Sequence, residues 1–131
     1  MRTLIITIAV MVLASGCSRD GKKAGDRPGA VAGVLVAWKL AGLEPKGFQK
    51  VDSLEGGRCE RGSVGEIETT LCAFHDEETA RKAQAAGLSA IGDVTGASLA
   101  EGKLLLVVAD RKRADPSGRR LNEIARTFRK R

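Results

Sequence analysis

Six consecutive apolar residues, Leu104 to Ala109, constrain the fold of this chain more than any other segment. In an extended strand, alternate side chains point to opposite faces, so this run is apolar on both sides. A strand of that kind is typical of the centre of a sheet. We therefore expect a strand at residues 103–110, joined by a turn at residues 100–102 to a strand at residues 93–99.

A second pair of strands is predicted at residues 58–64 and 66–74, because apolar and polar side chains alternate along the second of these segments. Glycines within residues 62–65 supply the turn between them. If the two strands pair about this turn, Cys59 and Cys72 face nearly opposite positions.

Three helices are predicted from apolar periodicity and from signals at the helix ends. The first spans residues 30–42, with Gly42 just past its last turn. The second spans residues 76–87, with Asp76 as its N-cap. The third begins at Asp115-Pro116, with proline at the first helical position. The residues expected to face the core are Val31, Leu35, Trp38 and either Ala41 or Gly42, with Val34 beside them, in the first helix, Ala80, Ala83 and either Ala86 or Gly87 in the second, and Leu121, Ile124, Ala125 and Phe128 in the third.

In chain order, these elements predict one small α+β domain at residues 30–131, with the order α-β-β-α-β-β-α. We expect the three helices to pack on one face of a four-stranded, mainly antiparallel sheet. Residues 46–56 are either a linker or a short strand around Phe48 and Val51. Aromatic residues make up only 3% of the chain, so aliphatic side chains must form most of the core.

The first seventeen residues contain the three parts of a secretory signal. Arg2 is basic, residues 4–14 are apolar and uncharged, and the small residues Ala14, Ser15 and Gly16 come directly before Cys17. The apolar run is shorter than the roughly 20 residues that a membrane-spanning helix needs. Residues 1–17 resemble the signal sequence and lipobox of bacterial lipoproteins, and the resemblance ends there.

This resemblance implies that residues 1–16 are removed and that Cys17 receives a diacylglycerol thioether and an N-linked acyl chain such as palmitate. Several acyl chains would hold the protein stably in a lipid bilayer. The polar, glycine-rich residues 17–29 would then form a flexible tether. Ser18, directly after the cysteine, favours the outer over the inner membrane if the source has two membranes. The alternative is an ordinary secreted protein that is cleaved after a small residue.

Cys59 and Cys72 remain once Cys17 carries lipid, and an even pair of cysteines in an exported chain predicts a disulfide. Twelve residues separate the two cysteines. Closing a loop of this size stabilises a protein by about 3 kcal/mol in the chain-entropy model. That is a large share of the net stability of a small domain.

The positive charge of the chain is concentrated at its C-terminal end. The formal net charge is +6, and residues 111–131 hold nine Lys and Arg residues against two acidic ones. Basic residues around the apolar stripe of a helix are suited to binding anionic lipid headgroups or polysaccharide. The alternative is a helix docked on the sheet, whose basic residues only solvate its outer face and its C-terminal end. The six candidate binding residues are Arg119, Arg120, Arg126, Arg129, Lys130 and Arg131.

No catalytic residue is assigned from the sequence. His75 is the only histidine, and Cys72 and His75 supply two ligands where a structural zinc site needs four. Arg61 stands where a nucleophile elbow around Ser63 needs its first glycine, and residues 96–104 depart from the spacing of a phosphate-binding loop. A small hydrolase that uses His75 as general base is the remaining enzymatic hypothesis.

Together these features predict a membrane-anchored envelope lipoprotein that is not an enzyme and acts as a binding or structural module. Its partners would be the lipid bilayer, through Cys17, and an envelope protein or an anionic polymer. The alternative is a peripheral module whose basic C-terminal helix binds anionic lipid or polysaccharide. We expect no cofactor and no metal, and no nucleic-acid partner because aromatic residues are not interleaved with the basic ones.

Overall fold

Residues 29–131 are described by the structure, a computed structural model of the chain. The predicted signal sequence and Cys17 lie outside the described residues. Within the described range the elements are α1 (Gly29–Leu40), β1 (Pro45–Val51), β2 (Arg58–Val64), β3 (Ile67–Ala73), α2 (Glu77–Ile91), β4 (Gly96–Glu101), β5 (Leu104–Ala109) and α3 (Arg119–Lys130).

The strands form one antiparallel sheet in the order β1-β2-β3-β5-β4. The α+β class and the antiparallel sheet are confirmed, but the predicted number of four strands is wrong. The fifth strand is β1, at the edge of the sheet, and its pairing with β2 is irregular between Lys46 and Gln49. An irregularity of this kind breaks the alternation of apolar and polar residues, which is why these residues were equally compatible with a linker.

Strand β5 lies inside the sheet, between β3 and β4, and all six of its residues are buried. Its side chains alternate between two separate apolar clusters. Leu104, Leu106 and Val108 pack in one cluster, and Leu105, Val107 and Ala109 in the other. The apolar run at these positions therefore reflects a strand that is covered on both faces.

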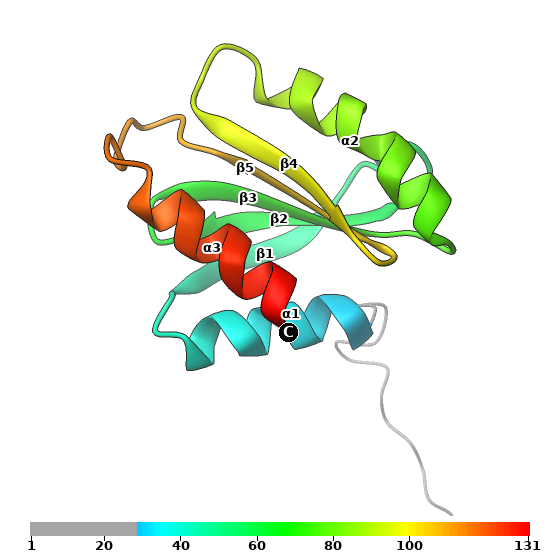
Figure 1. Cartoon of the computed structure of the whole chain (residues 1–131), viewed down its shortest axis with the longest axis horizontal. Helices are drawn as coiled ribbons and strands as arrows, with labels where there is room; N and C mark the ends of the chain where they lie inside the picture. The colour runs from blue at the N-terminus through cyan, green and yellow to red at the C-terminus, as the bar shows by residue number, and fades with distance from the viewer. Residues whose placement is uncertain (1–28) are drawn as a thin grey trace, which may run out of the picture.

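The helices form a layer on each face of the sheet (Figure 1). Helices α1 and α3 share one apolar cluster with the sheet, whereas α2 packs in the other. The expectation that all three helices lie on one face is therefore wrong. The small residues Ala80, Ala83 and Gly87 are buried in α2, and they let this helix lie close to β4 and β5.

Helix α1 buries Val31, Val34, Leu35 and Trp38 as predicted, but the prediction that Ala41 or Gly42 continues this face is wrong, because both are exposed in the turn after the helix. It ends with hydrogen bonds from Gly42 N–H to the Lys39 carbonyl and from Leu43 N–H to the Trp38 carbonyl. Gly42 has a φ of 79°. This pattern is a Schellman motif with glycine at the left-handed position, as predicted.

Helix α2 begins as predicted but ends later. The Asp76 side chain accepts a hydrogen bond from Thr79 N–H at 2.7 Å, which satisfies a free amide of the first turn. The predicted end at Gly87 is wrong, because the helix continues to Ile91 and is followed by Gly92 with a φ of 71°. Gly87 lies at the contact with Ser98 and Val107 instead.

Candidate functional site: the outer surface of helices α1 and α3

The apolar residues predicted on one side of α3 hold this helix against the rest of the domain. Leu121, Ile124 and Phe128 are buried against the sheet and α1, and Ala125 is partly buried. The helix begins at Arg119, so the predicted start at Pro116 is wrong.

The turn before α3 explains this later start. The buried Asp110 carboxylate accepts hydrogen bonds from Ala114 N–H and Asp115 N–H, which fold residues 110–115 into a loop. Asp115 then accepts a hydrogen bond from Leu121 N–H at 3.0 Å, so it serves the first turn of α3 from outside the helix. This hydrogen bond, with a smaller contribution from Arg120, lowers the pKa of Asp115 below its usual value.

All six basic candidate residues of the C-terminal segment are exposed. Arg119, Arg126 and Lys130 recur at helical spacing on the side of α3 that lies opposite the buried stripe. We call these three residues the basic stripe; the exposed Glu123 lies among them, and the side keeps a net positive charge. Arg120 and Arg129 flank it on the same helix.

Arg131 differs from the other five basic residues because it folds back onto the end of its own helix. Its guanidinium lies 4.6 Å from the centre of the Phe128 ring and donates a hydrogen bond to the Phe128 carbonyl at 2.9 Å. Partial burial lowers the pKa of Arg131, opposed by the attraction of Glu101. This side chain therefore helps to end the helix in addition to carrying charge.

Helix α1 lies beside α3 in the same layer. The Trp38 indole Nε1 donates a buried hydrogen bond to the Ile124 carbonyl at 3.2 Å, and this contact fixes the two helices to each other. On the side of α1 opposite its buried residues lie Gly29, Gly33, Val36 and Leu40, all exposed. We call these four residues the apolar stripe; Val36 is 54% and Leu40 is 85% exposed.

The sequence analysis did not identify the apolar stripe, although a signal for it was present. Eleven of the twelve residues of α1 carry no charge or polar side chain, and Lys39 is the exception. A surface helix normally has a polar outer face, so a helix that is apolar all round indicates that its outer face is also covered. The predicted core residues cover only the inner face of the helix, and its outer face was given no role.

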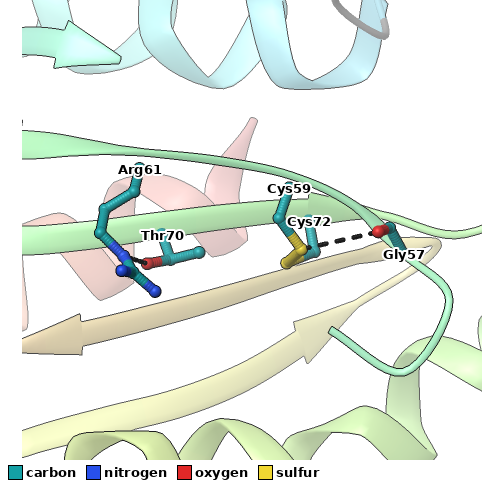
Figure 2. The surroundings of a disulfide bond; sticks show 5 residues. All are labelled: Gly57, Cys59, Arg61, Thr70 and Cys72. Atoms are coloured by element: carbon teal, nitrogen blue, oxygen red, sulfur yellow. Dashed lines mark hydrogen bonds between the residues drawn. A yellow bond between two sulfur atoms is a disulfide. The ribbon is translucent and has the colours of Figure 1, made fainter. Parts of the chain in front are cut away.

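Cys59 and Cys72 form the predicted disulfide (Figure 2). They are directly paired residues of β2 and β3, with Cα atoms 4.0 Å apart, and both are buried on the α2 side of the sheet. The Cys59 sulfur also lies 3.8 Å from the Gly57 carbonyl oxygen. Farther along the same hairpin, Arg61 Nε donates to Thr70 Oγ1 at 3.1 Å. The disulfide thus joins two strands that are already in register.

A second cluster of charged residues lies at the other end of the hairpin. Arg111 donates hydrogen bonds to the Ala90 and Ile91 carbonyls and to Glu68 Oε1, while Lys112 pairs with Glu66. These groups line a surface pocket of about 240 Å³. Because the acidic and basic side chains are paired and α2 carbonyls take up two Arg111 donors, we assign the cluster a structural role.

The remaining chemical candidates do not converge on one site. His75 is 82% exposed and lies 2.7 Å from Asp76. Ser63 is part of β2, and residues 96–104 form the predicted hairpin of β4 and β5. In residues 29–131 no three His, Cys, Asp or Glu side chains are grouped so that they could hold a metal ion.

Comparison of the chain with protein-family models, with curated proteins and with solved structures found no match. Among the helices of residues 29–131, none has the length and apolar character needed to cross a membrane.

Proposed function

We propose that this chain is an exported, lipid-anchored lipoprotein of the bacterial cell envelope. In this proposal Cys17 carries the lipid, residues 17–28 form the tether up to the start of α1 at Gly29, and the folded domain is a non-enzymatic binding or structural module. The observation that supports export is the buried disulfide between Cys59 and Cys72. Disulfides form and persist in oxidising compartments outside the cytoplasm.

The cysteine count strengthens this argument. The chain has three cysteines, and the disulfide uses two of them. The third, Cys17, is the residue that the lipobox resemblance marks for acylation. Ser18 after it favours the outer membrane in a cell with two membranes. No cysteine is then left as a free thiol in an oxidising compartment.

The intact mass of the protein extracted from membranes tests the proposal. We expect a mass that begins at Cys17 and includes the acyl groups, and that rises by two hydrogens on reduction. A Cys17→Ser variant is the matched control, because it should lose the lipid and keep the disulfide. An unlipidated or uncleaved wild-type chain would contradict the anchor, and a mass unchanged by reduction would contradict the disulfide.

The basic stripe of α3 favours a second candidate function, in which the domain binds anionic lipid or polysaccharide. All three of its residues are exposed on the outer side of the helix. Deleting residues 119–131 would be a poor test, because it would also remove the buried residues Leu121, Ile124 and Phe128. Replacing Arg119, Arg126 and Lys130 by Gln should weaken polyanion binding at low salt without unfolding the domain. Unchanged binding would exclude this candidate.

A catalytic role for His75 is not part of the proposal. Its ring is largely in solvent and its partner is the N-cap residue of α2. A general base acts on a substrate held within hydrogen-bond distance. If a hydrolytic activity is found in the purified protein, loss of that activity in a His75→Ala variant would overturn the non-enzymatic proposal.

A further inference from the structure

We infer that the outer surface of the α1 and α3 layer rests on an anionic phospholipid bilayer, with the apolar stripe of α1 in the interface and the basic stripe of α3 on the lipid phosphates. This inference deepens the proposed function and rests on it, since it takes the anchor at Cys17 as given. It adds which face of the domain the membrane contacts.

Helix α1 presents an apolar outer surface to solvent. Its outward residues Gly29, Gly33, Val36 and Leu40 place uncharged surface in solvent along the whole helix. Large apolar side chains exposed in the described part of the chain are Val36, Leu40 and Leu88, so two of the three lie on this one stripe. An exposed apolar helix face marks a surface that is covered in the working state of the protein.

Positive charge lies next to this apolar surface. The basic stripe lies on α3, which packs beside α1 on the same face of the sheet (Figure 1). The buried hydrogen bond from Trp38 to the Ile124 carbonyl holds the two helices together, so the apolar and basic stripes move as one body. Apolar side chains beside Lys and Arg residues are the combination by which helices lie in an anionic membrane interface.

The proposed anchor at Cys17 is close in the sequence to the start of α1. Gly29, the first residue of α1, lies twelve positions after Cys17 in the sequence. A chain of that length spans at most about 40 Å when fully extended. The start of α1 is therefore kept within about one domain diameter of the bilayer surface, and the effective concentration of this face at the membrane is high.

The opposite face of the molecule has a different character. Helix α2 exposes Glu77 and Glu78 in its first turn together with Arg81 and Lys82, and Glu78 pairs with Lys82 at 2.9 Å. These four charges balance, so this side of α2 offers no net positive charge to anionic lipid. Leu88, on the exposed side of α2, is 56% exposed and provides a leucine on this face for comparison with Leu40.

Depth-dependent quenching on the full processed protein tests the inference. A fluorophore is attached at Leu40→Cys or, as the control, at Leu88→Cys, in protein bound to vesicles of phosphatidylcholine and phosphatidylglycerol with brominated acyl chains. The buried disulfide does not react with the label. We expect quenching at position 40 to be at least about threefold stronger than at position 88, because an interfacial helix buries its apolar face roughly 5–10 Å into the bilayer.

The charge arm uses Arg119→Gln/Arg126→Gln/Lys130→Gln on the labelled Leu40→Cys protein. We expect quenching at position 40 to fall in this variant, and also with added salt, because both weaken attraction to the lipid phosphates. A variant with Arg81→Gln and Lys82→Gln on α2 is the control for general loss of charge and should leave the quenching unchanged.

Each other outcome has a separate meaning. Lipidated protein with no quenching at position 40, or with equal quenching at 40 and 88, overturns the inference and leaves the proposed function standing. Self-association through position 40 without vesicles makes a second copy the occupant of the apolar stripe and also overturns it. A chain whose mass shows no lipid overturns the proposed function and, because the inference takes the anchor at Cys17 as given, overturns the inference with it.

Discussion

The indole Nε1 of Trp38 donates a hydrogen bond to the carbonyl oxygen of Ile124, a residue 86 positions later in the chain. Both groups are buried, and Trp38 also packs near Phe48, with ring centroids 6.2 Å apart. This contact joins the first helix of the described chain to the last. It fixes the geometry of the surface that we assign to the membrane.

We predict that Trp38→Phe lowers the free energy of unfolding by about 2 kcal/mol, because it removes the buried hydrogen bond to the Ile124 carbonyl and part of a packed ring. Urea denaturation followed by circular dichroism measures the change. Val36→Ala, on the exposed side of the same helix, is the control and should cost much less. A loss below about 0.5 kcal/mol for Trp38→Phe would show that the hydrogen bond does not stabilise the α1 and α3 layer.

Reduction of the disulfide should lower the free energy of unfolding by about 2–4 kcal/mol, because the unfolded chain regains the freedom that the link between Cys59 and Cys72 removes. Their separation is 13 positions. Thermal unfolding with and without reductant measures the effect. The double variant Cys59→Ala/Cys72→Ala should be insensitive to reductant, and a reductant effect that persists in it would have another source.

Gly87→Ala is expected to destabilise the protein by about 1–3 kcal/mol. A Cβ at this position would overlap Ser98 Oγ and come within 2.8 Å of Val107 Cγ2. Among the described residues, Ser98 Oγ is buried without a hydrogen-bond partner, so Ser98→Ala should not destabilise. In a double-mutant cycle, Gly87→Ala should cost less in the Ser98→Ala background.

Gly33→Ala is the matched control for the same change in a helix. It lies in α1 with nothing within 4 Å of an added Cβ, so we expect it to stabilise by about 0.5–1 kcal/mol. Equal effects of the alanine at positions 33 and 87 would contradict the close packing of α2 on β4.

Arg111→Gln should lower the free energy of unfolding by about 1 kcal/mol, because Arg111 donates to the free Ala90 and Ile91 carbonyls at the end of α2. Arg111→Lys should not restore the loss fully, since an ammonium lacks the planar set of donors. Lys112→Gln is the control, because its pair with Glu66 is exposed and should be worth less than about 0.5 kcal/mol. Equal losses at both positions would contradict a capping role.

Stability should fall when the pH drops below about 4. Hydrogen bonds from Thr79 N–H to Asp76 and from Leu121 N–H to Asp115 lower the pKa of each carboxyl below 3.8. The stabilisation is present above the unfolded-state pKa and is lost as the pH falls through the folded-state pKa. Thermal unfolding from pH 2 to pH 6 measures the loss.

The control for this acid sensitivity is Asp76→Asn/Asp115→Asn, which keeps an oxygen acceptor at each position and removes the titration. This variant should show a smaller drop in stability between pH 6 and pH 2 than the wild type. An identical drop would place the acid-sensitive groups elsewhere in the protein.

Local patterns in the sequence predicted the elements whose formation depends on residues close together in the sequence. The β2 and β3 hairpin follows from alternation and the glycines of its turn, and Asp76 and Gly42 predicted helix ends from their hydrogen-bonding and backbone preferences. The disulfide depended on both arguments, since its cysteines are paired residues of that hairpin.

What the sequence did not reveal was set by packing between distant segments. Glycine is common at helix ends, and for this reason Gly87 was predicted to end α2. In the structure Gly87 lies inside α2, where the absence of a side chain lets the helix approach Ser98. The apolar residues of β5 predict that both faces of the sheet are covered. They do not indicate which helix covers which face. Periodicity predicted the inner face of α1, but it did not indicate that the outer face is also apolar and unpaired with another element.

The pairing of β1 with β2 is irregular between Lys46 and Gln49. As the first strand in the sheet order, β1 presents one open edge to which a strand of another molecule could add. The exposed lysines at positions 46 and 50 and the break in the ladder make that edge a poor template for another strand. The β1 edge therefore disfavours the addition of a strand from a second copy of the chain.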